Sequence, residues 1–210
     1  RNHIHIINIQ KTVPLMKDAC SFAEKIATDG GKILFVGTKR AAREIIQRHA
    51  TNVKMPYVNN RWLGGMLTNF VTIRKAVKKM TAIDKMKEDG TISTLSKRER
   101  LQLDRKREKL EKDLGSISDM NRLPGAIFIV DIVKEKIALL EAKKLGIPTF
   151  AMVDSNSDPN LVDFPIPSND DASKSIDIIL SFVSNAVSEA LKEREVQKKT
   201  KLDEDKKSSK

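Results

Sequence analysis

Three short apolar runs, each followed by a helical pattern, constrain the fold of this chain more than any other feature. The runs are KILFV (32–36), AIFIV (126–130) and PTFAMV (148–153). Strands that are buried on both faces of a parallel sheet have such uninterrupted apolar sequences. Helical patterns follow the runs at residues 39–50, 134–145 and 170–189. The alternation predicts an α/β protein with a mostly parallel sheet between two layers of helices.

Shorter elements complete this α/β pattern. HIINI (5–9) is predicted as a strand, followed by a helix from about Thr12 to the Gly30-Gly31 pair. MPYV (55–58) and FPI (164–166) are predicted as short strands. We favour a doubly wound sheet of the Rossmann-like or flavodoxin-like kind, with strand order 2-1-3-4-5.

The pattern changes between Phe70 and Asp119. Apolar residues recur there at helical spacing, first at Phe70, Ile73, Val77, Met80, Ile83 and Met86, then more sparsely at Leu103, Leu110, Leu114 and Ile117. Two amphipathic helices with a break near Gly90 predict an antiparallel coiled-coil hairpin over 70–119. The α/β core domain would then be discontinuous, comprising 1–69 and 120–190. The polar tail 191–210 lacks apolar spacing and is expected to be flexible.

Charge is distributed unevenly along the chain. The formal net charge is +11, and residues 61–112 hold 15 Lys/Arg against 7 Asp/Glu, whereas residues 113–190 hold 6 against 12. A basic surface of this kind indicates a polyanionic partner, either nucleic acid or an anionic membrane surface. No apolar run approaches the roughly 20 residues that span a bilayer. The single cysteine, Cys20, cannot form an internal disulfide, which fits a reducing compartment.

The stretch VGTKRA (36–41) follows a buried strand, where doubly wound proteins usually bind their ligands. Neither the phosphate-loop pattern nor the dinucleotide fingerprint is present. We predict that Lys39 and Arg40 contact RNA phosphate, the alternative being that both are simply solvated. A nucleotide-binding enzyme or sensor that uses the Gly37–Arg40 loop is a second hypothesis. No catalytic constellation, metal site or cofactor motif is found.

The predicted hairpin carries more basic residues than its own acids can pair. Residues 73–112 contain 14 Lys/Arg against 7 Asp/Glu. A rigid basic arm can contact an RNA backbone without reading its sequence. The alternatives are a solvated face with internal ion pairs, and an adaptor for acidic proteins. The predicted RNA-contacting residues on this arm are Arg74, Lys75, Lys78, Lys79, Arg105 and Lys106.

YVNNRWLGGMLTNF (57–70) holds the only Tyr and the only Trp of the chain. We predict that Trp62 packs between the base of the hairpin and the core; stacking on an RNA base is the alternative. Arg61 is predicted to reach a phosphate or a nearby carboxylate. Gly64 and Gly65 would let the chain turn from the sheet into the first hairpin helix. The stretch is therefore predicted to be a structural hinge.

A resemblance to a known family runs through most of the chain. It is carried in order by HIINIQKTVPLM (5–16), GKILFVGTKR (31–40), NNRWLGGMLTNF (59–70), LPGAIFIVD (123–131) and GIPTFAMVDSNSDPNLVDFPIPSNDDA (146–172). These stretches are similar to the bacterial-type small-subunit ribosomal protein S-two family. RWLGG and VDSNSDP together are highly specific, although neither would be alone.

The resemblance implies a non-catalytic constituent of the small ribosomal subunit. It implies contacts with small-subunit ribosomal RNA and with neighbouring ribosomal proteins, the large messenger-binding protein S-one among them. It also implies a Rossmann-like core with a protruding coiled-coil hairpin. The expected location is the ribosome of a bacterial cytoplasm, with an organellar ribosome as the alternative; no membrane and no small-molecule substrate are expected.

Overall fold

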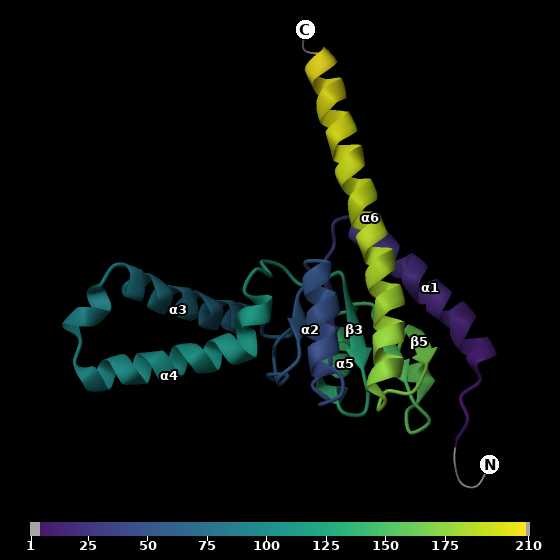
Figure 1. Cartoon of the computed structure of the whole chain (residues 1–210), viewed down its shortest axis with the longest axis horizontal. Coiled ribbons are helices and arrows are strands. Elements are labelled where there is room, and N and C mark those ends of the chain that lie inside the picture. Colours follow the sequence, from purple (N-terminus) through teal and green to yellow (C-terminus); the bar gives the residue numbers. More distant parts are fainter. Residues whose placement is uncertain (1–4, 209–210) are drawn as a thin grey trace.

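A five-stranded parallel sheet forms the centre of the molecule (Figure 1). The computed structural model describes residues 5–208. The strand order is β2-β1-β3-β4-β5, so the predicted α/β class and the predicted order are both confirmed. The strands are β1 (Ile33–Val36), β2 (Tyr57–Val58), β3 (Ala126–Val130), β4 (Thr149–Val153) and β5 (Phe164–Pro167).

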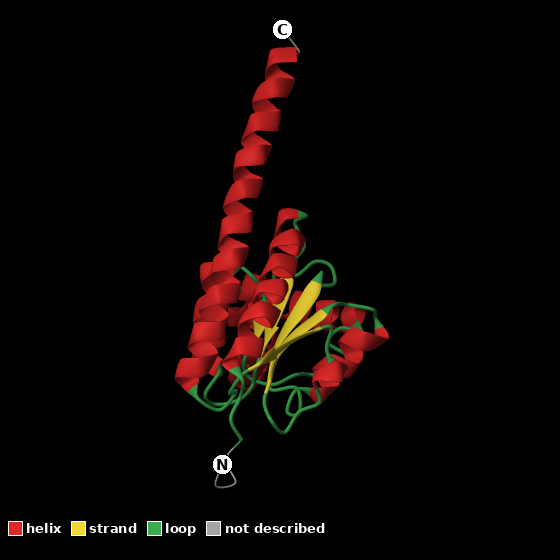
Figure 2. Cartoon of the chain, turned by 90° about the vertical axis from the view of Figure 1, so that its right-hand side faces the viewer, coloured by secondary structure: helices red, strands yellow, loops and turns green. Residues whose placement is uncertain are grey.

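Helices cover both faces of this sheet (Figure 2). One face is packed by α1 (Ile9–Thr28), α2 (Arg43–Asn52) and α6 (Ser173–Ser208). The other is packed by α5 (Lys136–Lys144) and by the segment that follows β2. Successive strand residues point to opposite faces, so Phe35 joins the first core and Leu34 the second. This explains why the central strands have uninterrupted apolar sequences.

A row of phenylalanines crosses the sheet on the α1 side. Phe35 lies beside Phe128 in register, Phe128 beside Phe150, and Phe150 beside Phe164. Their ring centroids are 5.6, 6.1 and 6.2 Å apart. Phe22 of α1 stacks on Phe164 with a centroid distance of 4.5 Å. Aromatic pairs at such distances add to the burial energy, so the row holds four strands and one helix together.

Two helices project away from the sheet side by side (Figure 1). They are α3 (Phe70–Glu88) and α4 (Lys97–Leu114), and we call residues 70–117 the arm. α4 begins with a capping box, in which the Ser96 hydroxyl accepts from the Glu99 N–H while the Glu99 carboxylate accepts from the Ser96 N–H. The apolar stripe of α3 is buried at Ile73, Val77, Met80 and Ile83. The first two of these residues join the core on the α5 side of the sheet.

The start of the described chain differs from the sequence prediction. HIINI was predicted as a strand, but residues 5–8 form none and α1 already begins at Ile9. The Asn8 side chain accepts a hydrogen bond from the Gln10 N–H and so caps the helix there. The tail predicted as flexible continues α6 as far as Ser208; residues 209–210 lie outside the described part. Among the described residues, no helix combines the length and apolar character needed to cross a membrane.

Gly37 offers a test of how closely α2 packs on the sheet. A Cβ atom at this position would lie 2.2 Å from Ile46 Cδ1 and 3.2 Å from Val130 Cβ, both in the buried core. We expect Gly37→Ala to lower the free energy of unfolding by about 1–3 kcal/mol through overpacking. Urea denaturation followed by circular dichroism measures this. The control is Gly64→Ala, because a Cβ there meets nothing within 4 Å; a control as damaging as Gly37→Ala would contradict the explanation.

Candidate nucleic-acid interface

The carboxylate of Glu141, on α5, organises the hinge loop (residues 59–69) that connects β2 to the arm. Its Oε1 accepts hydrogen bonds from the Trp62 indole Nε1 at 3.1 Å and from the Gly65 N–H at 2.7 Å. Its Oε2 accepts from the Leu67 N–H at 2.9 Å, the Thr68 N–H at 3.1 Å and the Thr68 hydroxyl at 3.2 Å. One buried side chain thus fixes four residues of the loop.

These bonds determine the charge of the Glu141 carboxyl. Burial disfavours its ionised form, but the N–H groups of Thr68, Leu67 and Gly65 and the Trp62 indole outweigh burial and lower its pKa. A carboxylate that receives several N–H donors is held as an anion. The hinge loop is therefore held by a charged group rather than by apolar contact alone.

The predicted hinge residues lie around this carboxylate. Trp62 is only 8% exposed and packs in the core beneath the arm, so its ring offers no face to an RNA base. Gly65 has φ +85°, a conformation that glycine adopts without strain. Gly64 is exposed and needs no such φ. Arg61 is exposed, and within the described part of the chain its side chain has neither a hydrogen bond nor an ion pair, so it is free for an external partner.

Sequence reasoning missed Glu141. The sequence feature that could have indicated it is its position in the apolar stripe of α5, between the buried Leu139 and Ala142. A carboxylate on the buried face of a helix needs a partner, because an unpaired buried charge is very costly. Its donors come from a loop more than 70 residues earlier in the chain, and the sequence does not show which loop that is.

Lys39, one of the predicted phosphate contacts, is an internal counter-ion. Its Nζ lies 3.2 Å from Asp131 Oδ2 and 2.7 Å from Asp170 Oδ1, and it also pairs with Asp171. Burial opposes the charged form of Lys39, but the hydrogen bonds to Asp170, Asp171 and Asp131 outweigh it and raise the pKa. Carboxylate oxygens of Asp154, Asp170 and Asp171 lie within 4.8 Å of one another, a spacing that suits a metal ion. The Lys39 ammonium already supplies a positive charge to this cluster.

The neighbouring part of the Gly37–Arg40 loop is also engaged within the chain. Thr38 donates to Glu135 Oε1 from its backbone N–H at 2.8 Å and from its hydroxyl at 2.5 Å. Arg43 Nε donates to the Thr38 carbonyl at 2.9 Å. The Thr38 N–H and hydroxyl and the Lys39 ammonium thus already have partners within the chain, which does not favour the nucleotide-binding alternative. Arg40 remains exposed, without a hydrogen bond or ion pair to any other described residue.

The arm brings together most of the other predicted RNA contacts. Lys75, Lys78, Lys79, Arg105 and Lys106 are all exposed. The nearby ammonium of Lys79 lowers the pKa of Lys106, so the two helices hold like charges close together. An anion between these two side chains would relieve their repulsion.

Arg74 differs from the other basic residues of the arm. Its guanidinium donates to the carbonyls of Ser118 at 3.0 Å and Met120 at 3.1 Å, and to Asn121 Oδ1 at 2.7 Å. Arg74 therefore braces α3 against the segment that returns to the sheet. Three of its N–H donors are therefore used within the chain, which does not favour the predicted phosphate contact of Arg74.

The hydrogen bonds that Glu141 accepts lead to a prediction about stability and its dependence on pH. Glu141→Gln replaces an acceptor oxygen by an NH₂ group that faces N–H donors, so we expect the free energy of unfolding to fall by about 3 kcal/mol at pH 7. Because the folded-state pKa is lowered, this stabilisation is present above the ordinary glutamate pKa of about 4.3 and is lost as the pH falls through the folded-state value.

Urea denaturation of both proteins at pH 7 and pH 3 measures the effect. The difference between wild type and Glu141→Gln should shrink at pH 3. Glu189→Gln is the control, because Glu189 is exposed on α6 and should change the free energy of unfolding by less than about 0.5 kcal/mol. A difference that stays constant with pH would show that the charge of Glu141 is not what holds the loop.

Comparison with known proteins places the chain in a family. A family model described as "Ribosomal protein S2" matches residues 1–190. The chain is 61% identical over 205 residues to the small ribosomal subunit protein uS2 of Flavobacterium johnsoniae, covering 98% of this chain and 81% of that protein. It is 62% identical over 194 residues to uS2 of Flavobacterium psychrophilum, with 92% and 73% covered, and 60% identical over 198 residues to uS2 of Porphyromonas gingivalis, with 94% and 70% covered. The chain belongs to the ribosomal protein S2 family.

Proposed function

We propose that this chain is a non-catalytic structural constituent of the bacterial small ribosomal subunit, where it binds ribosomal RNA and neighbouring ribosomal proteins. Family membership and the names of its bacterial relatives support this role. The structural observation that carries the RNA contact is the unmatched positive charge on the arm. Fold alone would not support the proposal, because doubly wound sheets serve many functions.

The ion pairs of the arm identify which of its charges are free. Arg107 pairs with Asp84 at 2.8 Å and with Glu111 at 3.5 Å, and Lys87 pairs with Asp104 at 2.6 Å. These pairs leave exposed the positive charges of Lys75, Lys78, Lys79, Arg105 and Lys106. Lysine and arginine side chains on a straight helical surface suit contacts to successive phosphates, which position a protein on RNA without reading bases.

The arm acts as a coiled-coil module set on a discontinuous core of residues 1–69 and 120–190. Arg40 and Arg61 extend the basic surface onto this core. The acidic half, residues 113–190, with 12 Asp/Glu against 6 Lys/Arg, suits basic protein neighbours instead. Docking of the messenger-binding protein S-one is part of the same proposal, and its support is the family resemblance.

Charge reversal on the arm tests the proposal. We expect the triple variant Lys75→Glu, Lys78→Glu, Lys79→Glu to enter small subunits at least about fivefold less than wild type, because it replaces phosphate attraction by repulsion. Sedimentation of ribosomes from cells expressing tagged protein measures incorporation.

The matched control reverses three exposed lysines of α1, Lys11, Lys17 and Lys25, on the side of the core away from the arm (Figure 1). This control variant changes the net charge equally and should enter small subunits within about twofold of wild type.

Binding of small-subunit ribosomal RNA in a filter assay at several salt concentrations gives a second readout. Loss of three phosphate contacts should reduce the salt slope by about 3. Normal incorporation and an unchanged slope would refute the role of the arm.

A further inference from the structure

The outward side of α5 carries a row of exposed aliphatic side chains. Val133, Ile137 and Leu140 are 55%, 56% and 55% exposed. Their spacing of four and then three residues places them one above the other on the same side of the helix. The opposite side of α5 packs on the sheet. Single exposed aliphatic residues are ordinary, but three in one row form an apolar surface that suits a partner.

The turn before α5 adds Val133 to this row. The Asp131 carboxylate accepts hydrogen bonds from the Val133 N–H at 3.1 Å and from the Lys134 N–H at 3.0 Å. The Glu135 N–H donates to the Asp131 carbonyl at 3.0 Å, which is the bonding pattern of an α-helix. The helical path therefore begins before Lys136, and Val133 keeps its helical spacing from Ile137.

The exposed charges beside this row are all positive. Both glutamates of residues 133–145 are buried and engaged within the chain, Glu135 by Thr38 and Glu141 by the hinge loop. The same segment has four exposed lysines whose side chains make no hydrogen bond or ion pair with any other described residue: Lys134, Lys136, Lys143 and Lys144. Residues 113–190 hold only 6 Lys/Arg against 12 Asp/Glu. The outward side of α5 is thus a basic surface on the acidic half of the chain.

Helical spacing places the lysines on both sides of the aliphatic row. At about 100° per residue, Lys136 and Lys143 lie on one side of the row and Lys134 on the other. Lys143 and Lys144 are in the last turn, where they stabilise the helix dipole. Lys134 and Lys136 lie at the amino end, where positive charge is unfavourable. Helix stability therefore does not explain these two lysines, whereas carboxylates on a partner would.

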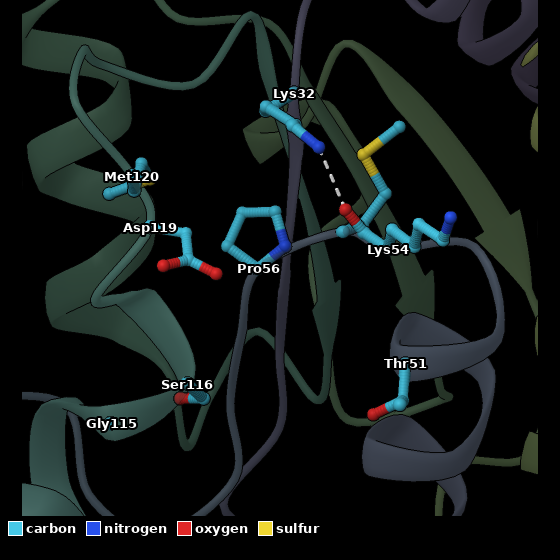
Figure 3. Close-up of a pocket in the computed structure, with 9 residues that line it drawn as sticks. Lys32, Thr51, Lys54, Pro56, Gly115, Ser116, Asp119 and Met120 are labelled. Atoms are coloured by element: carbon cyan, nitrogen blue, oxygen red, sulfur yellow. Dashed lines mark hydrogen bonds between the residues drawn. The ribbon is translucent and has the colours of Figure 1, made fainter.

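A hollow at the amino-terminal edge of the sheet suits docking less well. It has a volume of about 330 Å³, and Lys32, Pro56 and Met120 are among the residues that line it (Figure 3). Its apolar residues are buried, since Met55 and Met120 are each 4% exposed and Pro56 is buried as well. A partner would meet little apolar surface there, whereas each of the three aliphatic residues on α5 is more than half exposed.

We propose that the outward side of α5 docks an acidic amphipathic helix of a neighbouring protein. We call this surface the α5 face, and it comprises Val133, Lys134, Lys136, Ile137, Leu140, Lys143 and Lys144. The partner helix would lay apolar residues along the aliphatic row and bring Asp or Glu to the flanking lysines. RNA fits the face less well, because branched aliphatic side chains have no ring on which a base can stack. The inference rests on the proposed function, since it gives the chemistry of one protein neighbour.

Binding of designed peptides to the isotope-labelled whole chain, followed by amide NMR shifts, tests the proposal. The acidic peptide has leucine at helical spacing along one face and glutamate elsewhere; in the basic peptide, lysine replaces every glutamate. We expect the acidic peptide to shift the amides of residues 133–145, with a dissociation constant below about 1 mM. The basic peptide should bind at least about tenfold more weakly, because like charges oppose it. Equal binding of both peptides, or no shift at residues 133–145, would overturn the proposal.

Substitutions on the α5 face separate the apolar contact from the charged one. Leu140→Ser should weaken the acidic peptide about fivefold, because it removes an aliphatic contact at the centre of the interface. Lys136→Glu should weaken the acidic peptide by a similar factor and strengthen the basic one. The control is Ile178→Ser, because Ile178 is 57% exposed on α6, across the sheet from α5, and should leave binding within about twofold of wild type. An acidic peptide that binds Leu140→Ser as tightly as wild type would also overturn the assignment.

The contact within the small subunit is tested with a photo-crosslinking side chain at position 137 of the whole chain. Mass spectrometry of crosslinked peptides from sedimented subunits identifies the neighbour. We expect an acidic protein segment with apolar residues at helical spacing, and we expect that segment to be absent when the crosslinker is at position 178 instead. Crosslinks only to ribosomal RNA or to a basic protein segment, or no crosslinks, would show that the partner is wrong.

These experiments distinguish failure of the docking surface from failure of the proposed function. If the acidic peptide does not bind but the lysine reversals on the arm still abolish incorporation, the α5 face is wrong and the ribosomal role stands. If the peptide binds the α5 face but the chain does not enter small subunits, the docking surface stands and the ribosomal role fails. If neither result is obtained, both fail.

Discussion

The carboxylate of Glu141 is the interaction on which the rest of the arrangement depends. It gathers three backbone N–H groups, an indole and a hydroxyl from one loop, and that loop is the link from the sheet to the arm. Backbone groups of a loop buried beneath a helical arm need partners, since an unsatisfied buried donor costs about 1–3 kcal/mol. A single anion from α5 supplies them, and Trp62 completes the contact by filling the space under the arm. The direction of the arm follows from this one side chain together with the brace made by Arg74.

The carboxyl edge of the sheet bears on what the fold can say about function. In most doubly wound proteins the carboxyl edge of the strands holds the ligand. Here that edge is occupied by the chain's own groups, Thr38 with Glu135 and Lys39 with three aspartates. The RNA contacts that we propose are instead on the arm. The doubly wound sheet alone would have suggested a ligand at the carboxyl edge, which illustrates why function must be argued from a site and not from a fold.

Sequence patterns predicted the elements whose burial repeats regularly along the chain, which are the central strands and the helices of the arm. The central strands are continuous apolar runs because both their faces are buried, and the arm shows helical spacing because one face of each helix is buried. The strand predicted at HIINI (5–9) was wrong. Its β-branched residues are typical of a strand, but the side chain of Asn8 caps a helix that begins at Ile9. The internal pairing of Lys39 could not be predicted, because its partners lie 92 and 131 residues away. Partners so distant in sequence leave no periodic signal, and Glu141 was missed for the same reason.

The length of the arm gives the hinge loop a mechanical significance. With 19 residues in α3 and a rise of about 1.5 Å per residue, the arm is a lever of about 28 Å. A rotation of only about 10° at its base would displace the tip by about 5 Å, nearly one helical turn. The angle that the hinge loop holds therefore decides where the basic side chains of the arm lie. The charged carboxylate of Glu141 at the base of the arm restricts that angle.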